Sequence, residues 1–401
     1  MSYLKSAALL FVLFVCVFLS GCQKDDDAGT GPKAVLTLQV DANYSETGDH
    51  WIFATDATGE VLDVEPYSAG KTVTLTSAKA VNKINVTLFR YYEDVIITST
   101  HKYTNLNTYA DIPVGTALLF KSTTVDNGPK ATAHFTIANT NGNQVYFTNG
   151  STLSERSEPD YTNGVGELVD LSFYGAPSDM LMTSYRSGIP VYNWAKGLKD
   201  GDVVSRDFQT DFIPYPHQLF LDFGGSSSGY VKARNAAGKS YYMSDSYFST
   251  GATPVIGFID GFASYQMYIY NTKPNGTVSY YKSGPFNLSP TIPTFNFSIS
   301  KEDFLDYAFD FSLDYTTYGV SWSYSDGLEY TWWSMSAPAG TTFTKLNIPD
   351  EIAAKYPKLD ESKFGEISIG FTKVLQGKLR LMPGAPENSD DVETYSYQPN
   401  F

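Results

Sequence analysis

The chain has 401 residues, of which 42% are hydrophobic and 18% are charged. This composition excludes a highly charged disordered chain and a protein with many membrane spans. Its 30 Tyr, 26 Phe and 5 Trp stand beside 32 Gly and 20 Pro, a mixture that favours strands joined by tight turns. The net charge of −15 repels phosphate backbones, so nucleic acid is not an expected partner. We therefore expect an all-β protein.

The first residues have the pattern of an export signal. Lys5 precedes an unbroken apolar run at residues 7–19, and its 13 residues are fewer than the ~20 that a membrane-spanning helix needs. The run ends in Leu19-Ser20-Gly21-Cys22. This string resembles the lipobox of bacterial lipoproteins, which implies a signal peptide at residues 1–21 and a lipid on the thiol of Cys22. The alternative is an uncleaved anchor, for which the run is too short.

Cleavage before Cys22 also decides which cysteines remain. The mature chain of 380 residues loses Lys5 and Cys16, which changes the net charge to −16. Because Cys22 is consumed by the lipid, no thiol is left for a disulfide, a nucleophile or a metal ligand. Packing alone must then hold an exported fold together.

Residues 22–33 follow the leader as an acidic, glycine-containing tether. The step Lys24-Asp25-Asp26 resembles the surface-export signal of Bacteroidota lipoproteins, which implies an outer-membrane, lipid-anchored protein exposed on the cell surface. The alternative is that any acidic segment of this kind is simply a solvated linker.

From residue 34 onward, polarity alternates with a period of two. Leu36, Leu38 and Val40 form one apolar face, and the same alternation returns at Phe309 and Phe311. Such half-apolar strands are typical of β-sandwiches. We expect strands of this kind near Leu36, Phe135, Leu221 and Phe311.

A hairpin with an Asp or Asn and a Gly in its turn recurs four times. Residues 54–59 (ATDATG) match residues 233–238 (ARNAAG), where Asp56 or Asn235 would bond its own turn and the Gly would take a positive φ. Asn149-Gly150 and Asp326-Gly327 are two-residue hairpin signals.

The hairpins open near Trp51, Val145, Val231 and Val320, a period of roughly 90 residues that matches the size of an immunoglobulin-like sandwich. We therefore expect four tandem immunoglobulin-like modules. Their predicted bounds are 34–127, 128–215, 216–298 and 299–401. Two larger sandwiches are the alternative. Two short helices are expected, one after the capping box Ser300-Lys301-Glu302-Asp303 and one over residues 349–356.

The sequence lacks a clear catalytic or metal-binding pattern. The four histidines, at positions 50, 101, 134 and 217, have no paired spacing. Residues 225–229 (GSSSG) match the nucleophile-elbow pattern, but β-type sequence follows them, so we expect a connecting loop. Asp200 and Asp202 fit a turn better than a Ca²⁺ loop, and residues 389–391 fit a solvated loop. We expect no catalytic residue, metal or cofactor, although carboxylate pairs for glycoside hydrolysis stay open among 43 acidic residues.

Aromatic residues after Asp326-Gly327 give the one indication of a binding site. A turn at these two residues pairs Ser325 with Leu328, Ser323 with Tyr330 and Ser321 with Trp332, and it leaves Val320, Trp322 and Trp333 on the opposite, apolar face. Tyr330 and Trp332 would then be exposed above small serines, as stacking on a sugar ring or on a protein requires. The alternative is that both rings pack on the neighbouring module. The Tyr pairs 91/92, 241/242 and 280/281 repeat the pattern, with one ring of each pair on either face.

Two classes of function fit these observations. The first is a non-enzymatic surface binding or adhesion protein, held to the outer membrane by lipid and contacting a polysaccharide or a surface protein. A more specific version of this hypothesis is a glycan-binding lipoprotein of a polysaccharide-uptake system. It is implied only by the resemblance of the export signals and of the expected architecture. The second class is a hydrolase of carbohydrate or protein on a β scaffold.

Overall fold

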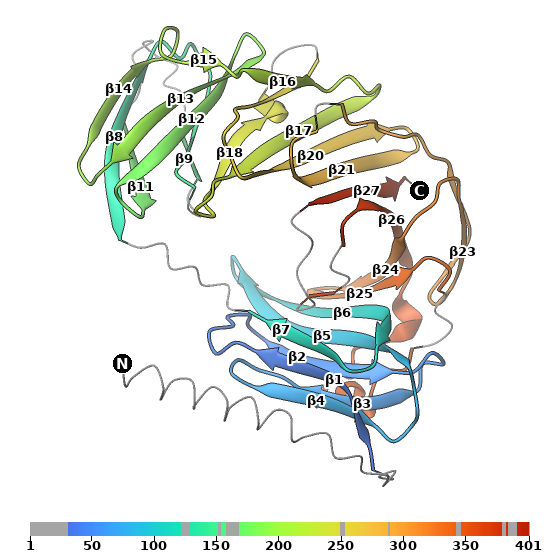
Figure 1. Ribbon diagram of the computed structural model, residues 1–401. Helices are drawn as coiled ribbons and strands as arrows, with labels where there is room; N and C mark the ends of the chain where they lie inside the picture. Colours follow the sequence, from blue (N-terminus) through green and yellow to red (C-terminus); the bar gives the residue numbers. More distant parts are fainter. Residues whose placement is uncertain are drawn as a thin grey trace, which may run out of the picture.

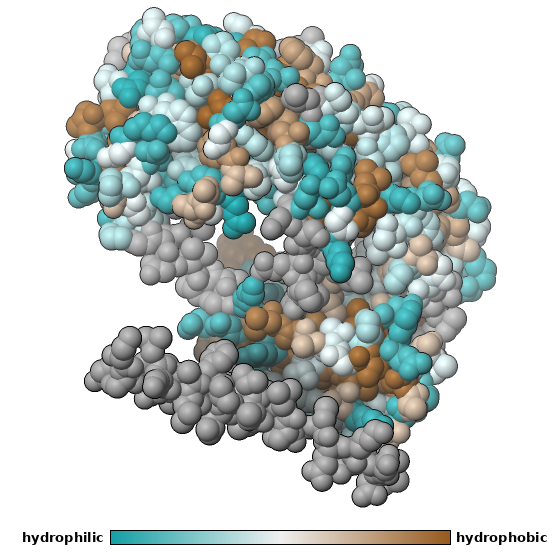
Figure 2. Space-filling model, viewed as in Figure 1, coloured by the Kyte–Doolittle hydropathy of each residue, from teal (hydrophilic) through white to brown (hydrophobic). Residues whose placement is uncertain are grey.

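The computed structural model describes residues 31–121, 129–150, 154–157, 168–248, 253–287, 289–341, 346–378, 382–383 and 391–400. The fold is all-β, and its sheets pack face to face as in β-sandwiches (Figure 1). Figure 2 shows small hydrophobic patches scattered among hydrophilic ones and a hollow near the centre of the molecule.

The first strand group packs two sheets around an aliphatic core. Its strands are β1 (Lys33–Val40), β2 (Asp49–Thr55), β3 (Val61–Pro66), β4 (Thr72–Ser77), β5 (Lys83–Ile96), β6 (Ser99–Pro113) and β7 (Thr116–Phe120). The sheet β4-β1-β7 covers β3-β2-β5-β6, and Leu38, Leu75, Ile52 and Val86 are buried between them. The alternation expected near Leu36 is confirmed, because β1 buries Leu36, Leu38 and Val40.

The second strand group packs a three-stranded sheet on a five-stranded one. Its strands are β8 (Lys130–Ala138), β9 (Val145–Thr148), β10 (Ser154–Ser157), β11 (Leu168–Tyr174), β12 (Ser178–Arg186), β13 (Ile189–Leu198), β14 (Val203–Asp207) and β15 (Ile213–Pro214). The sheets β11-β8-β14 and β10-β9-β12-β13-β15 enclose Phe135, Phe147, Phe173 and Phe208. The other face of β12 contacts the third group, where the Tyr185 hydroxyl donates to the carbonyl of Val255 over 2.7 Å.

The third strand group places the two-stranded sheet β16-β19 over four strands of a larger sheet. Its elements are β16 (His217–Phe220), β17 (Ser226–Arg234), β18 (Ser240–Asp245), the 3-10 turn η1 (Ser246–Phe248), β19 (Val255–Phe258), β20 (Ser264–Lys273) and β21 (Gly276–Gly284). Val231, Met267, Ile269 and Tyr280 lie in its core. The strand expected near Leu221 ends one residue earlier, at Phe220.

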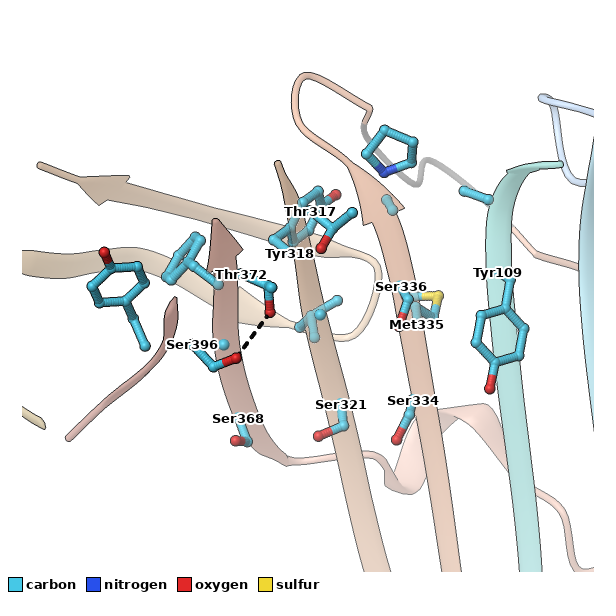
Figure 3. A pocket seen from close by; sticks show the side chains of 18 of the residues that line it. Tyr109, Thr317, Tyr318, Ser321, Ser334, Met335, Ser336, Ser368, Thr372 and Ser396 are labelled. Carbon is cyan, nitrogen blue, oxygen red and sulfur yellow. Dashed lines mark hydrogen bonds between the residues drawn. The ribbon is translucent and has the colours of Figure 1, made fainter. Parts of the chain in front are cut away.

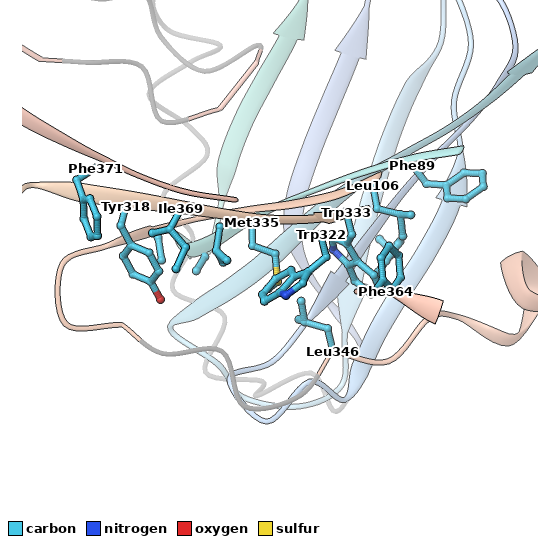
Figure 4. Packing of buried hydrophobic residues seen from close by; sticks show 14 of the residues in the cluster. Phe89, Leu106, Tyr318, Trp322, Trp333, Met335, Leu346, Phe364, Ile369 and Phe371 are labelled. Atoms are coloured by element: carbon cyan, nitrogen blue, oxygen red, sulfur yellow. The ribbon is translucent and has the colours of Figure 1, made fainter. Parts of the chain in front are cut away.

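The fourth group contains the largest buried side chains. Its elements are β22 (Phe297–Asp303), β23 (Asp306–Phe311), β24 (Thr317–Asp326), β25 (Glu329–Pro338), the helix α2 (Asp350–Lys355), the 3-10 turn η2 (Glu361–Lys363), β26 (Glu366–Gln376) and β27 (Val392–Pro399). Trp322 and Trp333, at 1% and 0% exposure, pack with Phe364 and Leu346 (Figure 4). The helix expected over residues 349–356 is confirmed by α2.

One twelve-stranded sheet joins the first, third and fourth groups. Its order is β18-β17-β20-β21-β27-β26-β24-β25-β6-β5-β2-β3. The joins are the antiparallel pair β21–β27 and the parallel pair β25–β6. The division into four modules stays a prediction. Strand pairing in this sheet continues across the first, third and fourth of the predicted segments.

The two faces of this sheet are covered differently. The face that carries Trp322, Trp333 and Phe89, which we call the covered face, packs against β22–β23, α2 and η2. We call the opposite face the open face. There the sheet β4-β1-β7 packs over only part of the long β5–β6 hairpin, and the core between them includes Val86 and Leu88 of β5. The half of the hairpin from Arg90 onward extends beyond the core residues of this sandwich.

The turn chemistry at Asp56 and Asn235 is confirmed. The backbone N–H of Gly59 donates to Asp56 and that of Gly238 to Asn235, with φ values of 81° and 82° at the glycines. Asn149-Gly150, in contrast, is not a two-residue turn. Thr148 pairs with Ser154, so residues 149–153 separate the strands, and the amide of buried Asn149 donates to the carbonyl of Tyr174.

The helix expected after the Ser300–Asp303 capping box is wrong. Residues 297–311 form the hairpin β22–β23, whose turn consists of Phe304 and Leu305, with Leu305 at a φ of 61°. Tertiary packing decides the outcome, since Phe304 contacts Trp322 and Trp333 at ring-centroid distances of 5.2 and 5.4 Å.

Candidate ligand-binding face

Tyr330 and Trp332 lie on the open face of β25, but not opposite the serines that we expected. The register pairs Asp326 with Glu329, so Tyr330 lies opposite Ser325 and Trp332 opposite Ser323. The predicted pairs Ser325–Leu328, Ser323–Tyr330 and Ser321–Trp332 are therefore wrong by two residues.

The cause of this error is the position of the turn. Gly327 and Leu328 occupy it, and Gly327, at a φ of 66°, takes the first central place as in a type II′ turn. Because a shift of two residues preserves the face of every side chain, Tyr330 and Trp332 are still on the side opposite Trp322 and Trp333.

The two rings lie side by side and nearly parallel. The Tyr330 and Trp332 ring centroids are 5.9 Å apart with an interplanar angle of 11°. Trp332 is 38% exposed, whereas Trp333, one residue further along the strand, is fully buried. Trp332 therefore presents aromatic surface to solvent.

Strand β6 adds two more rings, because it runs parallel to β25 and pairs Tyr103 with Tyr330. The Tyr103 ring lies 5.4 Å from Tyr330 and 6.1 Å from Trp332, with interplanar angles of 18° and 13°. His101 stacks on Tyr330 at 5.8 Å. The rings thus touch β6 along the surface of one sheet, and Trp332 stays exposed. The alternative that both rings pack on the neighbouring module stays a prediction.

Strand β5 completes the set. Tyr92 pairs with Tyr103 and stacks on it at 4.8 Å, and the guanidinium of Arg90 lies 4.4 Å from the Tyr92 ring centroid. We call Tyr92, Tyr103, Tyr330 and Trp332 the first aromatic row. It crosses three strands that come from two distant parts of the chain.

A cavity of about 520 Å³ lies on the open face of the same sheet (Figure 3). Its serine and threonine lining residues, which we call the hydroxyl groove, are Ser279, Thr317, Ser321, Ser334, Ser336, Ser368, Thr372 and Ser396. Ser321 pairs with both Ser334 and Ser368, so small side chains adjoin across three strands. Thr372 Oγ1 and Ser396 Oγ are 3.3 Å apart and share a hydrogen bond. The groove offers neutral donors and acceptors rather than charges.

The cavity of about 370 Å³ near Tyr356 has a different character. Its lysines are paired: Lys355 with Asp49 at 2.9 Å, Lys358 with Glu329 at 2.6 Å and Lys363 with Asp326 at 3.3 Å. Lys102 lies 3.8 Å from Glu329 as well, so each of the four lysines that line this cavity has a carboxylate partner.

The remaining sequence candidates have structural roles. Ser226 begins β17, and the strand continues to Arg234, so the GSSSG string is the start of a strand rather than the expected loop or an elbow before a helix. Asp200 accepts from the backbone N–H of Thr132 and Asp202 from that of Lys199, which supports the turn interpretation. Asp391 pairs with the buried ammonium of Lys282, while residues 389 and 390 lie outside the described residues.

Among the residues that the structure describes, no three His, Cys, Asp or Glu side chains come together as a metal site would require. Two histidines have carboxylate partners instead, His134 with Asp170 and His217 with Asp260, each at 2.5 Å. The expectation that the chain uses no metal or cofactor stays a prediction.

No protein-family model and no curated protein sequence matches the chain. The described part of the chain contains no helix with the length and apolar character of a membrane span. Cys22 and the leader lie outside the described residues, so lipidation stays a prediction.

Proposed function

We propose that the chain is a lipid-anchored, cell-surface binding protein without catalytic activity, and that its first aromatic row binds a glycan. The observation that carries the proposal is the row itself. Four rings from β5, β6 and β25 lie nearly parallel at centroid distances of 4.8 to 6.1 Å. The ring surface that the row leaves exposed, above all on Trp332 at 38% exposure, suits contact with the flat apolar faces of sugar rings.

The electrostatic character of the chain supports a neutral ligand. With a net charge of −15, the protein repels polyanions over distances beyond a single contact. The groove beside the row adds hydroxyl groups, which match a polyhydroxylated ligand. The anchor proposed at Cys22 would hold this face at the outer surface of the cell.

Affinity gels that contain neutral polysaccharides test this proposal. We expect a β-glucan, xylan or galactomannan gel to retard the wild-type protein without release of oligosaccharide. The double variant Tyr330→Ala, Trp332→Ala should lose about 5- to 150-fold in affinity, since two stacking contacts of about 0.5–1.5 kcal/mol each contribute about 1–3 kcal/mol.

Phe220→Ala is the matched control, because Phe220 is 54% exposed and lies on β16, outside the twelve-stranded sheet. Thermal unfolding of each variant separates binding from stability. An unchanged affinity in a folded double variant contradicts the role of the row, and released oligosaccharide contradicts the absence of catalysis.

A further inference from the structure

A second set of stacked tyrosines lies at the other end of the twelve-stranded sheet. Tyr230 on β17 pairs with Tyr268 on β20, and Tyr268 pairs with Tyr281 on β21. Both neighbouring ring pairs have centroid distances of 4.6 Å, with interplanar angles of 21° and 40°. The rings therefore cross three adjacent strands, as those of the first row do.

Strand β18 extends this set by one ring. Tyr242 stacks on Tyr230 at 5.7 Å and 18°, and its hydroxyl donates to the carboxylate of Asp245. The ammonium of Lys232 lies 5.6 Å from the Tyr230 centroid and 5.7 Å from that of Tyr242. We call Tyr242, Tyr230, Tyr268 and Tyr281 the second aromatic row. Each row thus has one cation near its terminal ring, Lys232 here and Arg90 in the first row.

Strand register places both rows on the open face. Ser279, on the same side of β21 as Tyr281, pairs with Ser396, which pairs with Thr372, which pairs with Thr317. Along β24 this side continues to Ser323, the partner of Trp332. No bulge interrupts these pairs between Ser279 and Trp332.

The Tyr pairs of the sequence show the same division of faces. Tyr241 and Tyr280 are buried at 4% and 0% exposure, while their neighbours Tyr242 and Tyr281 belong to the second row. Tyr91 packs on Tyr356 on the covered face at 5.0 Å, and Tyr92 belongs to the first row. The expectation that each pair points to both faces is confirmed, and all three outward rings are row members.

The distance between the rows limits the size of a ligand that contacts both. Tyr281 and Trp332 are separated by four strand spacings and, by register, by eight residues along the strands. At about 4.8 Å per spacing and about 3.3 Å per residue, the separation on a flattened sheet is about 30 Å. The hydroxyl groove lies between the two rows.

We propose that one neutral, linear polysaccharide chain contacts both aromatic rows at once and crosses the hydroxyl groove between them. This inference rests on the proposed function and adds the length and class of the ligand. A trisaccharide is too short to contact both rows. A polymer bound to one row meets the other at a high effective concentration, which can raise the affinity about 10²-fold or more.

Titration calorimetry of the full chain tests the inference with two probes, the polysaccharide retained best in the gels and its trisaccharide. The first-row variant is Tyr330→Ala, Trp332→Ala and the second-row variant is Tyr268→Ala, Tyr281→Ala. We expect each variant to lose at least 10-fold in affinity for the polymer. Neither should lose more than a few-fold for the trisaccharide, because the intact row still binds it.

The outcomes separate the two proposals. If the second-row variant binds polymer as tightly as the wild type while the first-row variant does not, the bridging inference is wrong and the proposed function stands. If the wild type binds no polysaccharide, the proposed function is wrong as well. Tyr268→Phe, Tyr281→Phe keeps both rings and should bind as the wild type does, so equal losses in the Ala and Phe variants also contradict the inference.

Discussion

At the scale of single residues, Asp56 holds the first hairpin turn together. Its carboxylate accepts hydrogen bonds from the backbone N–H and hydroxyl of Thr58, at 2.9 and 2.7 Å, and from the N–H of Glu60 at 3.1 Å. The ammonium of Lys79 pairs with it as well. Burial raises the pKa of Asp56, but these hydrogen bonds outweigh burial and lower the pKa to about 2.

Asp56 should therefore contribute to stability in a pH-dependent way. Because the folded pKa of about 2 lies below the unfolded value of 3.8, the contribution is complete above about pH 5 and is lost as the pH falls toward 2. We expect Asp56→Asn to lower the free energy of unfolding at pH 7 by about 2 kcal/mol and to flatten the acid limb of stability against pH. Urea unfolding between pH 2 and 7 measures both. Asp310→Asn, at an exposed site, is the control, and an equal loss there contradicts the role of Asp56.

At the scale of elements, the parallel pair β6–β25 is the join on which the first aromatic row depends. The indole N–H of Trp333 donates to the hydroxyl of Thr108 over 2.9 Å across this join, and Thr108 also bonds the hydroxyl of Thr87 on β5 at 2.8 Å. All three residues are buried. The hydrogen bonds fix β25 against β6 and so fix Tyr330 beside Tyr103.

Thr108→Val should test this join, because valine keeps the shape and removes both hydrogen bonds. The buried indole N–H of Trp333 is then unsatisfied, which costs about 1–3 kcal/mol of unfolding free energy. Thr104→Val on the same strand, at a half-buried site, should cost less than about 0.5 kcal/mol. Chemical denaturation measures both variants. A loss of the same size in a Trp333→Phe background would show that the bond to Trp333 is not the cause.

Local patterns in the sequence predict much of this element structure. Alternation locates β1 and β8, and the Asp56 and Asn235 turns form as their residues require. The face of Trp332 is predicted correctly even though the pairs are displaced, since a shift of two residues preserves the face of each side chain. The capping box at Ser300 fails because contacts of Phe304 with two distant tryptophans outweigh local helix preference.

The complete row is beyond what local patterns can predict. Tyr103 and Tyr330 are far apart in the sequence, and no local signal states that β6 and β25 pair in parallel. The one available indication was the Tyr91-Tyr92 pair, which placed a ring on each face of β5. The hydroxyl groove was missed for the same reason, because its serines and threonines come from several strands that meet only in the folded sheet.

At the scale of the whole molecule, one twelve-stranded sheet carries both aromatic rows on its open face, and the sheet β4-β1-β7 covers only part of that face. The anchor proposed at Cys22 would keep this face at the cell surface, where several weak stacking contacts along one polymer act together. The proposed anchor and the proposed binding face can be tested separately, the anchor with Cys22→Ser and the binding face with Tyr330→Ala, Trp332→Ala.

The retention of a fluorescently labelled neutral polysaccharide by intact cells tests this account most directly. Cells that display the wild-type chain, with display verified by protease shaving, should retain the polymer. Cells with Tyr330→Ala, Trp332→Ala at equal display should retain far less polymer than wild-type cells, because only the second aromatic row still binds it. Cys22→Ser cells should retain none because the chain is no longer anchored. Equal retention by wild-type and double-variant cells, or a bound polymer cut into oligosaccharides, would contradict the account.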